Sequence, residues 1–241
     1  MNMRKFLFSL ILCMGVSMMS FAQKELTSGM IKMELVDVKS DNPQIAMGME
    51  MMKGAITEVY FNSNKTLTKM NMMGGMVEMT SLLDNENENM DMLFNAMGQK
   101  MHISSTKEER DRMEAENNDA MKGAKIEEDH SDTKVILGYQ CYRVNVKNPE
   151  IPGMNMSLYV TNEIKANPKT MQGMQNVELK GFPLEMVIAS AEPNMTMVMR
   201  AVDLKTEVKD KVFEIKTDGY QKMNLKDFQK MMGSMGGAMG F

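Results

Sequence analysis

The sequence predicts a mainly β (α+β) protein, built as a strongly curved antiparallel sheet or incomplete β-barrel with a few covering helices. Three observations carry this prediction. Apolar residues fall in short alternating runs, which is the period of a half-buried strand. Turn-forming residues separate these runs at short intervals. Few segments have the length and charge pattern of a helix, so we expect strands to form most of the core.

The first 22 residues have the three parts of a secretory signal peptide. Arg4 and Lys5 form the positive region, residues 6–16 form an apolar run, and Ser20 and Ala22 supply small residues before the cleavage point. The apolar run is shorter than the ~20 residues that a membrane span needs. We therefore expect cleavage after Ala22, a periplasmic or secreted location, and no transmembrane span in the mature form.

Charge and cysteine content narrow the class of protein further. Cleavage removes Arg4 and Lys5 and no acidic residue, so the 28 Lys and Arg fall to 26 against 32 Asp and Glu. An acidic chain argues against nucleic acid and against anionic membrane surfaces as partners. Cys13 leaves with the signal peptide, and Cys141 remains alone. An internal disulfide is then impossible, so a packed core must supply the stability.

The alternating runs define the expected strands, and residues 23–224 are expected to form one curved-sheet domain. Turn signals such as Gly74-Gly75 and Asn148-Pro149 separate the strands. The strands are expected at residues 29–37, 56–62, 66–73, 76–83, 90–93, 99–104, 125–129, 140–147, 154–161, 184–191, 195–208 and 211–216.

Three segments have helical character. Residues 107–122 are highly charged and follow Thr106, a suitable N-cap, so we expect a charged helical insertion at 106–123. Residues 43–53 predict a short Met-rich helix. Residues 226–232 predict another, capped by Asn224. Segment 225–241 is thus expected to hold a short helix followed by a flexible tail rich in Met and Gly.

Four motifs follow one another in the second half of the chain. Residues 134–141 read K-x-I-x-G-Y-x-C, and residues 158–164 read L-Y-V-T-N-E-I. Residues 179–184 read L-x-G-x-P-L, and residues 213–220 read F-x-I-x-x-x-G-Y. In this order they resemble a family of exported bacterial domains of unknown function that is grouped with the LolA/LolB/LppX-like lipoprotein carriers.

The resemblance covers residues 29–220. It implies a curved antiparallel sheet closed on its concave side by helices, and an apolar ligand such as a lipid or a lipoprotein acyl chain. This chain departs from those carriers in one respect, because it is far richer in Met, with 35 in the full sequence.

The methionines fall at alternate positions, and alternate residues of a strand share one face. Three interpretations stay open for them. Unbranched Met side chains fill irregular gaps in a core. They also make an adaptable wall for an apolar ligand. The wall residues we expect are Met70, Met72, Met154, Met156, Met195, Met197 and Met199.

The third interpretation is a soft-metal site, because thioethers select Cu(I) and Ag(I) over harder cations. Met spacing alone is weak support for it when 35 of 241 residues are Met. The candidate ligands for this alternative are Met70, Met72, Met76, Met101 and His102. No other cofactor is expected.

Catalytic patterns are missing from the sequence. His102 and His130 are the only imidazoles, and no nucleophile, zinc-protease or phosphate-loop motif occurs. Paired carboxylates sit in charged runs, where nothing apolar would raise a pKa for acid catalysis. We therefore expect a non-enzymatic periplasmic binding or carrier domain. The alternatives are a Cu(I)/Ag(I)-binding protein and a structural or interaction domain of the envelope with a protein partner.

Overall fold

The computed structural model describes residues 25–50, 52–116, 124–147, 153–171, 177–191 and 194–239. The expected signal peptide of residues 1–22 lies outside them, as do residues 117–123 of the charged insertion. Within the described ranges, no helix combines the length and apolar character that a membrane crossing requires.

The strands form a single sheet in the order β12-β6-β5-β4-β3-β2-β1-β11-β10-β9-β8-β7. All neighbours pair antiparallel except β12 and β6, which are parallel. The two ends of this order do not pair with each other, so the sheet is open, as the sequence predicted. The strands are β1 (Gly29–Ser40), β2 (Ile56–Phe61), β3 (Lys65–Met72), β4 (Val77–Asp84), β5 (Met90–Ala96), β6 (Gln99–Ser105), β7 (Lys125–Ile136), β8 (Tyr139–Lys147), β9 (Met154–Thr161), β10 (Phe182–Ser190), β11 (Met195–Lys205) and β12 (Gln221–Lys222).

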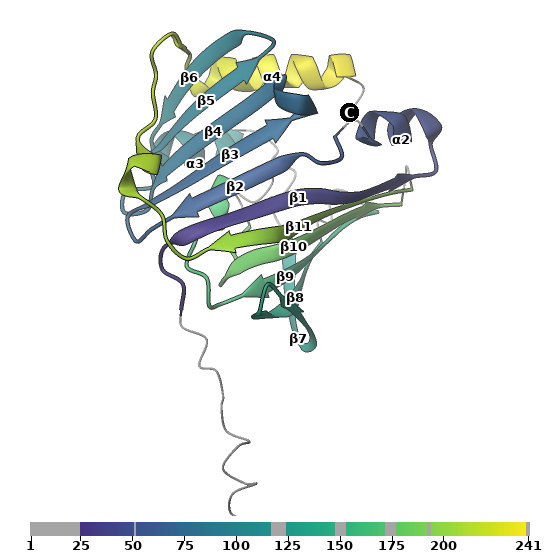
Figure 1. Ribbon diagram of the computed structural model, residues 1–241. Helices are drawn as coiled ribbons and strands as arrows, with labels where there is room; N and C mark the ends of the chain where they lie inside the picture. Colours follow the sequence, from purple (N-terminus) through teal and green to yellow (C-terminus); the bar gives the residue numbers. More distant parts are fainter. Residues whose placement is uncertain are drawn as a thin grey trace, which may run out of the picture.

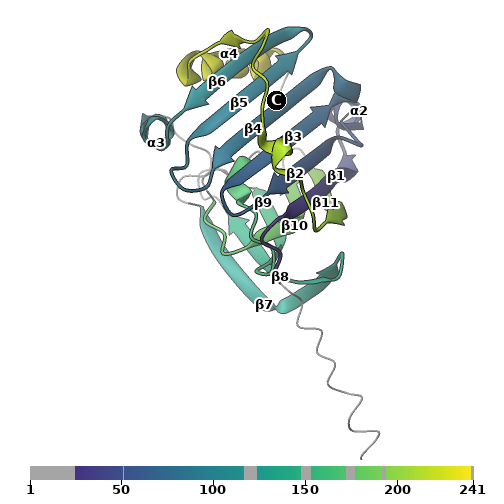
Figure 2. The same cartoon turned by 60° about the vertical axis from the view of Figure 1, so that its left-hand side comes forward.

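The sheet consists of two meanders that meet at β1. Strands β2 to β6 follow one another outward on one side of β1, and β11 back to β7 do so on the other. Figures 1 and 2 show the sheet bending at β1, so that the two meanders form the two arms of a curved layer. This bend brings together residues from strands that are distant in the sheet.

One face of both arms points into the bend, and we call it the inner face. Val59 of β2 and Val144 of β8 belong to the same buried cluster, although four strands separate them in the sheet. Because β2 and β8 belong to the two arms, this cluster follows one face of the sheet around the bend (Figures 1 and 2). The register then assigns the remaining strands, because residues directly opposite each other in a pair share a face.

In the part of the chain that the structure describes, helices α2, α3 and α4 accompany the sheet (Figure 1). Helix α2 (Pro43–Glu50) follows β1 and buries Met49. Helix α3 (Lys107–Glu116) begins at a capping box, in which Thr106 and Glu109 each accept a hydrogen bond from the other's backbone N–H at 3.2 and 2.9 Å. Helix α4 (Leu225–Met239) is capped by Asn224, whose Oδ1 accepts from the Asp227 N–H at 2.8 Å. Both expected caps are confirmed, and α4 takes in most of the segment that was expected to be a tail.

The structure differs from the sequence-based expectation at 211–216, where the predicted strand is wrong. That segment contains the 3₁₀ turn η3 (Asp210–Phe213), which contacts β3 and buries Phe213. A single large apolar side chain is buried there by a turn, without strand pairing. Strand β7 is also longer than predicted, because a register shift between Asp129 and Thr133 lets the pairing with β8 continue past the polar residues.

Two of the motif glycines have backbone roles. Leu137 and Gly138 have φ of 51° and 87° and form the two-residue turn between β7 and β8, as in a type I′ hairpin. At Gly181, a Cβ atom would lie 2.3 Å from the backbone oxygen of Thr161. Glycine at this position therefore permits the chain before β10 to pass directly against the end of β9.

Candidate functional site on the inner face of the sheet

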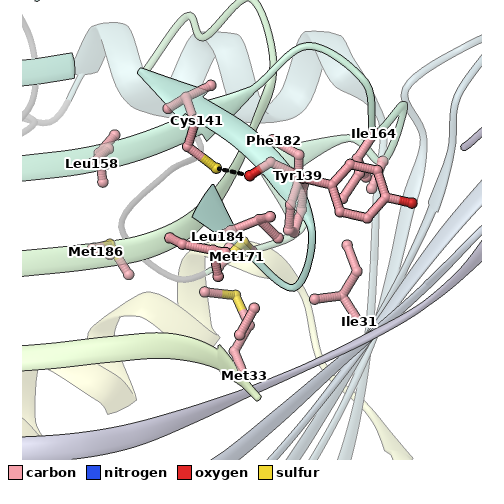
Figure 3. Close-up of a cluster of buried hydrophobic side chains, with 14 of the residues drawn as sticks. Ile31, Met33, Tyr139, Cys141, Leu158, Ile164, Met171, Phe182, Leu184 and Met186 are labelled. Carbon is pink, nitrogen blue, oxygen red and sulfur yellow. Dashed lines mark hydrogen bonds between the residues drawn. The ribbon is translucent and has the colours of Figure 1, made fainter. Parts of the chain in front are cut away.

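Two separate cores occupy the inner face. The larger core packs β1, β2 and β8 to β11 against the loop that contains the 3₁₀ turn η2 (Pro168–Thr170). Figure 3 shows Met171 of this loop among Met33 of β1 and Leu184 of β10. Met33 and Leu184 are completely buried, and Met171 is 2% exposed. The loop therefore fills the bend at one end of the inner face.

The smaller core lies at the outer edge of the other arm, under α4. Phe94 of β5 and Met101 and Ile103 of β6 pack there against Phe228 of α4. The rings of Phe94 and Phe228 meet edge to face, with centroids 5.5 Å apart and an angle of 70° between the planes. Helix α4 thus covers β5 and β6 on the same face that the loop covers near β1.

Between the two cores the inner face carries methionines that neither core buries completely. We call this set the methionine strip, and it consists of Met72, Met79, Met92, Met154, Met195, Met197 and Met199. Met79 and Met92 pack partly against the smaller core, and Met199 packs partly against the larger one. The strip therefore lines the inner face of both arms with apolar, partly exposed side chains.

The register places the strip on the inner face. On one arm, Met199 lies opposite Met186, and Met197 lies opposite Ile188. Met186 belongs to the larger core. On the other arm, Met79 lies opposite Phe94, which belongs to the smaller core. Because opposite residues share a face, both sets of methionines face into the bend.

Burial falls along β9 to β11 toward the end of the sheet where α2 follows β1. Met186 is 4% exposed, whereas Met197 and Met195, farther along, are only partly buried. Met195 pairs with Ser40, the last residue of β1 before the α2 region. The strip is therefore most accessible at this end.

The opposite part of the inner face is covered by the loop with η2. Thr68 of β3 donates from Oγ1 to Oγ1 of Thr170 at 2.7 Å. Lys169 places Nζ 3.1 Å from both carboxylate oxygens of Glu88, in the turn between β4 and β5. Arg110 of α3 donates to the Glu88 backbone oxygen. These contacts tie the loop, α3 and the β4–β5 turn together.

The inner face of β2 to β6 and β9 to β11 carries no charged side chain among the residues that the structure describes. Its polar members are hydroxyls and an amide, such as the buried Thr57, Thr68 and Ser81. Charged residues of the same strands, such as Glu58 and Lys69, occupy the alternate positions and face outward. The site is therefore apolar and electrically neutral.

A buried ion cluster lies on the outward side of the β9–β11 arm. The Glu185 side chain is 4% exposed, and its carboxylate accepts from Lys134 Nζ at 2.7 and 2.9 Å and from Arg200. Burial by itself would raise the pKa of Glu185, but the hydrogen bonds from Lys134 and Arg200 outweigh it and hold the pKa below its usual value. The cluster faces away from the methionine strip and joins β7 to β10 and β11.

All of the wall residues expected from the sequence lie on the inner face. Met70 and Met156 are buried, at 7% and 5% exposure. The partly exposed ones are Met72, Met154, Met195, Met197 and Met199. Met79 and Met92 were not singled out, although their alternation with Val77 and Phe94 already carried the signal. That these side chains bind a ligand stays a prediction.

The five candidate metal ligands are not brought together. Met70, Met72 and Met101 lie on the inner face, while Met76 is 54% exposed in the β3–β4 turn. His102 points to the opposite face, with Nε2 2.9 Å from Asp91 Oδ1. Neighbouring residues of a strand point to opposite sides, so Met101 and His102 lie on opposite faces of β6.

Cys141 is not a reactive thiol in this structure. Its side chain is completely buried in the larger core, where Sγ donates to the Tyr139 carbonyl oxygen at 3.6 Å (Figure 3). Burial, with the charges of Glu163 and Glu185, raises the pKa of Cys141 to about 12. The thiol is therefore protonated at neutral pH.

Comparison with known families gives no match for this sequence. No family model matches the chain. No curated protein matches it either.

Solved structures give likenesses in shape. MucB of Pseudomonas aeruginosa, solved with MucA, is 7% identical over 79% of this chain, with a TM-score of 0.36. The lipoprotein LppX of Mycobacterium tuberculosis is 10% identical over 76% of this chain and 89% of its own, with a TM-score of 0.33. A putative outer-membrane lipoprotein-sorting domain from Vibrio parahaemolyticus is 8% identical over 80% of this chain and 92% of its own, with a TM-score of 0.34.

This chain spans 56% of the length of that MucB chain. Identities of 10% or less and TM-scores below 0.5 do not establish a shared function, so the function must be argued from the geometry of this chain. The fold itself is the open, curved antiparallel sheet that the resemblance to the lipoprotein carriers implies.

Proposed function

We propose that this protein is a non-enzymatic binding or carrier domain for an apolar ligand, such as a lipid or an acyl chain, that lies along the methionine strip. The observation that carries the proposal is the uncharged inner face, left partly exposed between two separate cores. Apolar side chains that stay partly exposed to water have a hydration cost, and apolar surface of this kind commonly marks a ligand or partner site.

The energetics favour a chain-like apolar ligand. Each methylene group that leaves water on the strip contributes about 0.8 kcal/mol, so a chain of ten carbons has a gross burial energy of about 8 kcal/mol before the entropy cost of binding. Unbranched Met side chains adjust to ligands of varied shape. A charged group on the strip would lose its hydration without gaining a partner, so any polar head of the ligand lies outside the strip.

The test is retention of an apolar ligand by matched variants. The double variant Met197→Gln, Met199→Gln keeps side-chain length and makes the centre of the strip polar. Met47→Gln makes the same change on α2, where the side chain is 68% exposed and is not one of the strip residues. Each protein is purified without detergent, and binding of the neutral fluorophore N-phenyl-1-naphthylamine is measured together with native mass spectrometry.

We expect the native protein and Met47→Gln to bind the probe alike, and the double variant to bind at least tenfold more weakly with an unchanged circular dichroism spectrum. Native spectra should show a lipid-sized adduct that the double variant loses. Equal probe binding by the double variant and the native protein would refute the strip as the site. A native protein that binds no probe and carries no adduct would favour the structural or interaction role instead.

A further inference from the structure

Two neighbouring hairpin turns at one edge of the sheet are joined through methionines. The β3–β4 turn contains the 3₁₀ turn η1 (Met73–Gly75), and the β5–β6 turn contains Met97 and Gly98. The backbone N–H of Met76 donates to the Met73 oxygen at 3.4 Å, and the N–H of Met97 donates to the Met76 oxygen at 3.2 Å. A chain of two backbone hydrogen bonds thus connects Met73, Met76 and Met97.

Packing does not account for methionine at positions 76 and 97, and Met73 is partly buried. Met97 is 88% exposed and Met76 is 54% exposed. Met73 and Met97 also have φ of 54° and 52°, a left-handed conformation that costs a side-chain-bearing residue about 1 kcal/mol and that normally selects Gly or Asn. The two turns therefore join three methionines through the backbone, and Met73 and Met97 adopt their left-handed conformation at an energetic cost.

The geometry allows the three sulfur atoms to converge. Residues linked by backbone hydrogen bonds have Cα atoms about 5–6 Å apart. Met73 and Met76 are three residues apart across a turn closed by a backbone hydrogen bond, which keeps their Cα atoms within about 7 Å of each other. A Cβ atom at Gly74 or Gly98 would meet nothing within 4 Å, so the space beside both turns is open. The three rotatable bonds of each Met can then bring the sulfurs to a common point.

We propose that Met73, Met76 and Met97 form a surface site for a soft monovalent cation, Cu(I) or Ag(I), held by three neutral thioether sulfurs. Thioethers prefer these ions over the hard cations, and binding forms three sulfur–metal bonds with release of bound water and no change of oxidation state. Among the described residues, no group of three or more His, Cys, Asp or Glu side chains is placed to hold a metal. The donor set differs from the one expected on sequence spacing, because Met97 reaches the site only through the fold.

The experiment uses Ag(I), which binds like Cu(I) and does not change oxidation state under air. The full mature protein, labelled with ¹³C at the Met methyl groups, is titrated with silver nitrate in chloride-free buffer and followed by NMR and calorimetry. The variants are Met97→Leu and Met76→Leu, which remove one sulfur each from an exposed position. The matched control is Met47→Leu, which removes a sulfur from α2 at a residue whose 68% exposure lies between those of Met76 and Met97.

We expect the first equivalent of Ag(I) to shift three methyl signals together, and each of these three signals to be assigned to Met73, Met76 or Met97. Met97→Leu and Met76→Leu should each weaken this first binding step at least tenfold, and Met47→Leu should leave it unchanged. N-phenyl-1-naphthylamine binding should be the same in all of these variants, which separates this site from the methionine strip.

Three results would overturn the site. The first is tight binding of the first equivalent by Met97→Leu, and the second is an equal loss in Met47→Leu, which would indicate unspecific capture by a Met-rich surface. The third is that the first equivalent of Ag(I) shifts the methyl signals of methionines other than these three. The NMR assignment is made on the unmutated protein, so the proposal stays testable if a variant folds poorly.

Discussion

Replacing Phe228 by Ala tests whether the two cores are energetically independent. Phe228 is 7% exposed and contacts Phe94 edge to face in the smaller core. Removal of the ring loses about 2–3 kcal/mol of apolar burial and about 1 kcal/mol of ring pairing. Since α4 lies at the edge of the sheet and leaves part of its contact surface to relax, we expect a cost near 3 kcal/mol rather than the upper end seen in closed cores.

This cost should fall on α4 and its immediate contacts. The larger core shares no residue with the smaller one, so it keeps its own packing when α4 is released. A loss of about 3 kcal/mol corresponds to roughly a hundredfold increase in the equilibrium constant for local opening of α4. Hydrogen exchange followed by mass spectrometry should therefore show about a hundredfold lower protection of the α4 amides, with unchanged protection in β9 to β11.

The control is Phe182→Ala, which removes a completely buried ring from the larger core. It should lower the protection of β1 and β8 to β11 together and lower the melting temperature of the whole protein. The reasoning is refuted if Phe228→Ala lowers protection equally in α4 and in β9 to β11, because the two cores would then unfold as one unit. An unchanged exchange rate in α4 would show that the Phe94–Phe228 contact does not hold the helix.

Two further predictions concern single positions. Gly181→Ala should lower the free energy of unfolding in urea by about 2–3 kcal/mol, because the new methyl group meets the Thr161 backbone. The control is Gly48→Ala, whose Cβ meets nothing within 4 Å and which should be neutral or slightly stabilising. Equal effects of the two substitutions would refute the close approach at Gly181. Glu185→Gln should lower stability by about 1–2 kcal/mol at pH 7, where the partly exposed Lys134 and Arg200 limit the loss. The pKa of Glu185 in the folded protein lies below its usual value of 4.5, so its contribution to stability is complete above pH 4.5 and is lost as the pH falls through the folded pKa. The urea midpoints of the variant and the native protein should therefore converge in acid. A constant gap between them would contradict the assignment.

The alternation of apolar residues was sufficient to predict the sheet and the face of its methionines. Met195, Met197 and Met199 follow the strand period, and the structure places them together on the inner face. The same period already separates Met101 from His102, so the geometry of that pair followed from the strand assignment. Local patterns were informative wherever a strand imposed them.

Features that depend on distant contacts could not be read from the sequence. The apolar residues Val212, Phe213 and Ile215 resemble a short strand, yet Phe213 is buried by a turn against β3. Nothing near Glu185 in the sequence shows that Lys134, on another strand, will neutralise it. The division into two cores likewise depends on where α4 returns to the sheet, which no local pattern encodes.

The position of β1 between the two meanders has a consequence for how the chain folds. Met30 pairs with Lys205, 175 residues later, whereas the pairings within each meander join strands that are adjacent in the chain. Closing so long a loop costs on the order of 3 kcal/mol more entropy than closing a hairpin. During synthesis, one edge of β1 therefore stays unpaired until β11 has emerged, and over that interval this edge is open to association with other molecules.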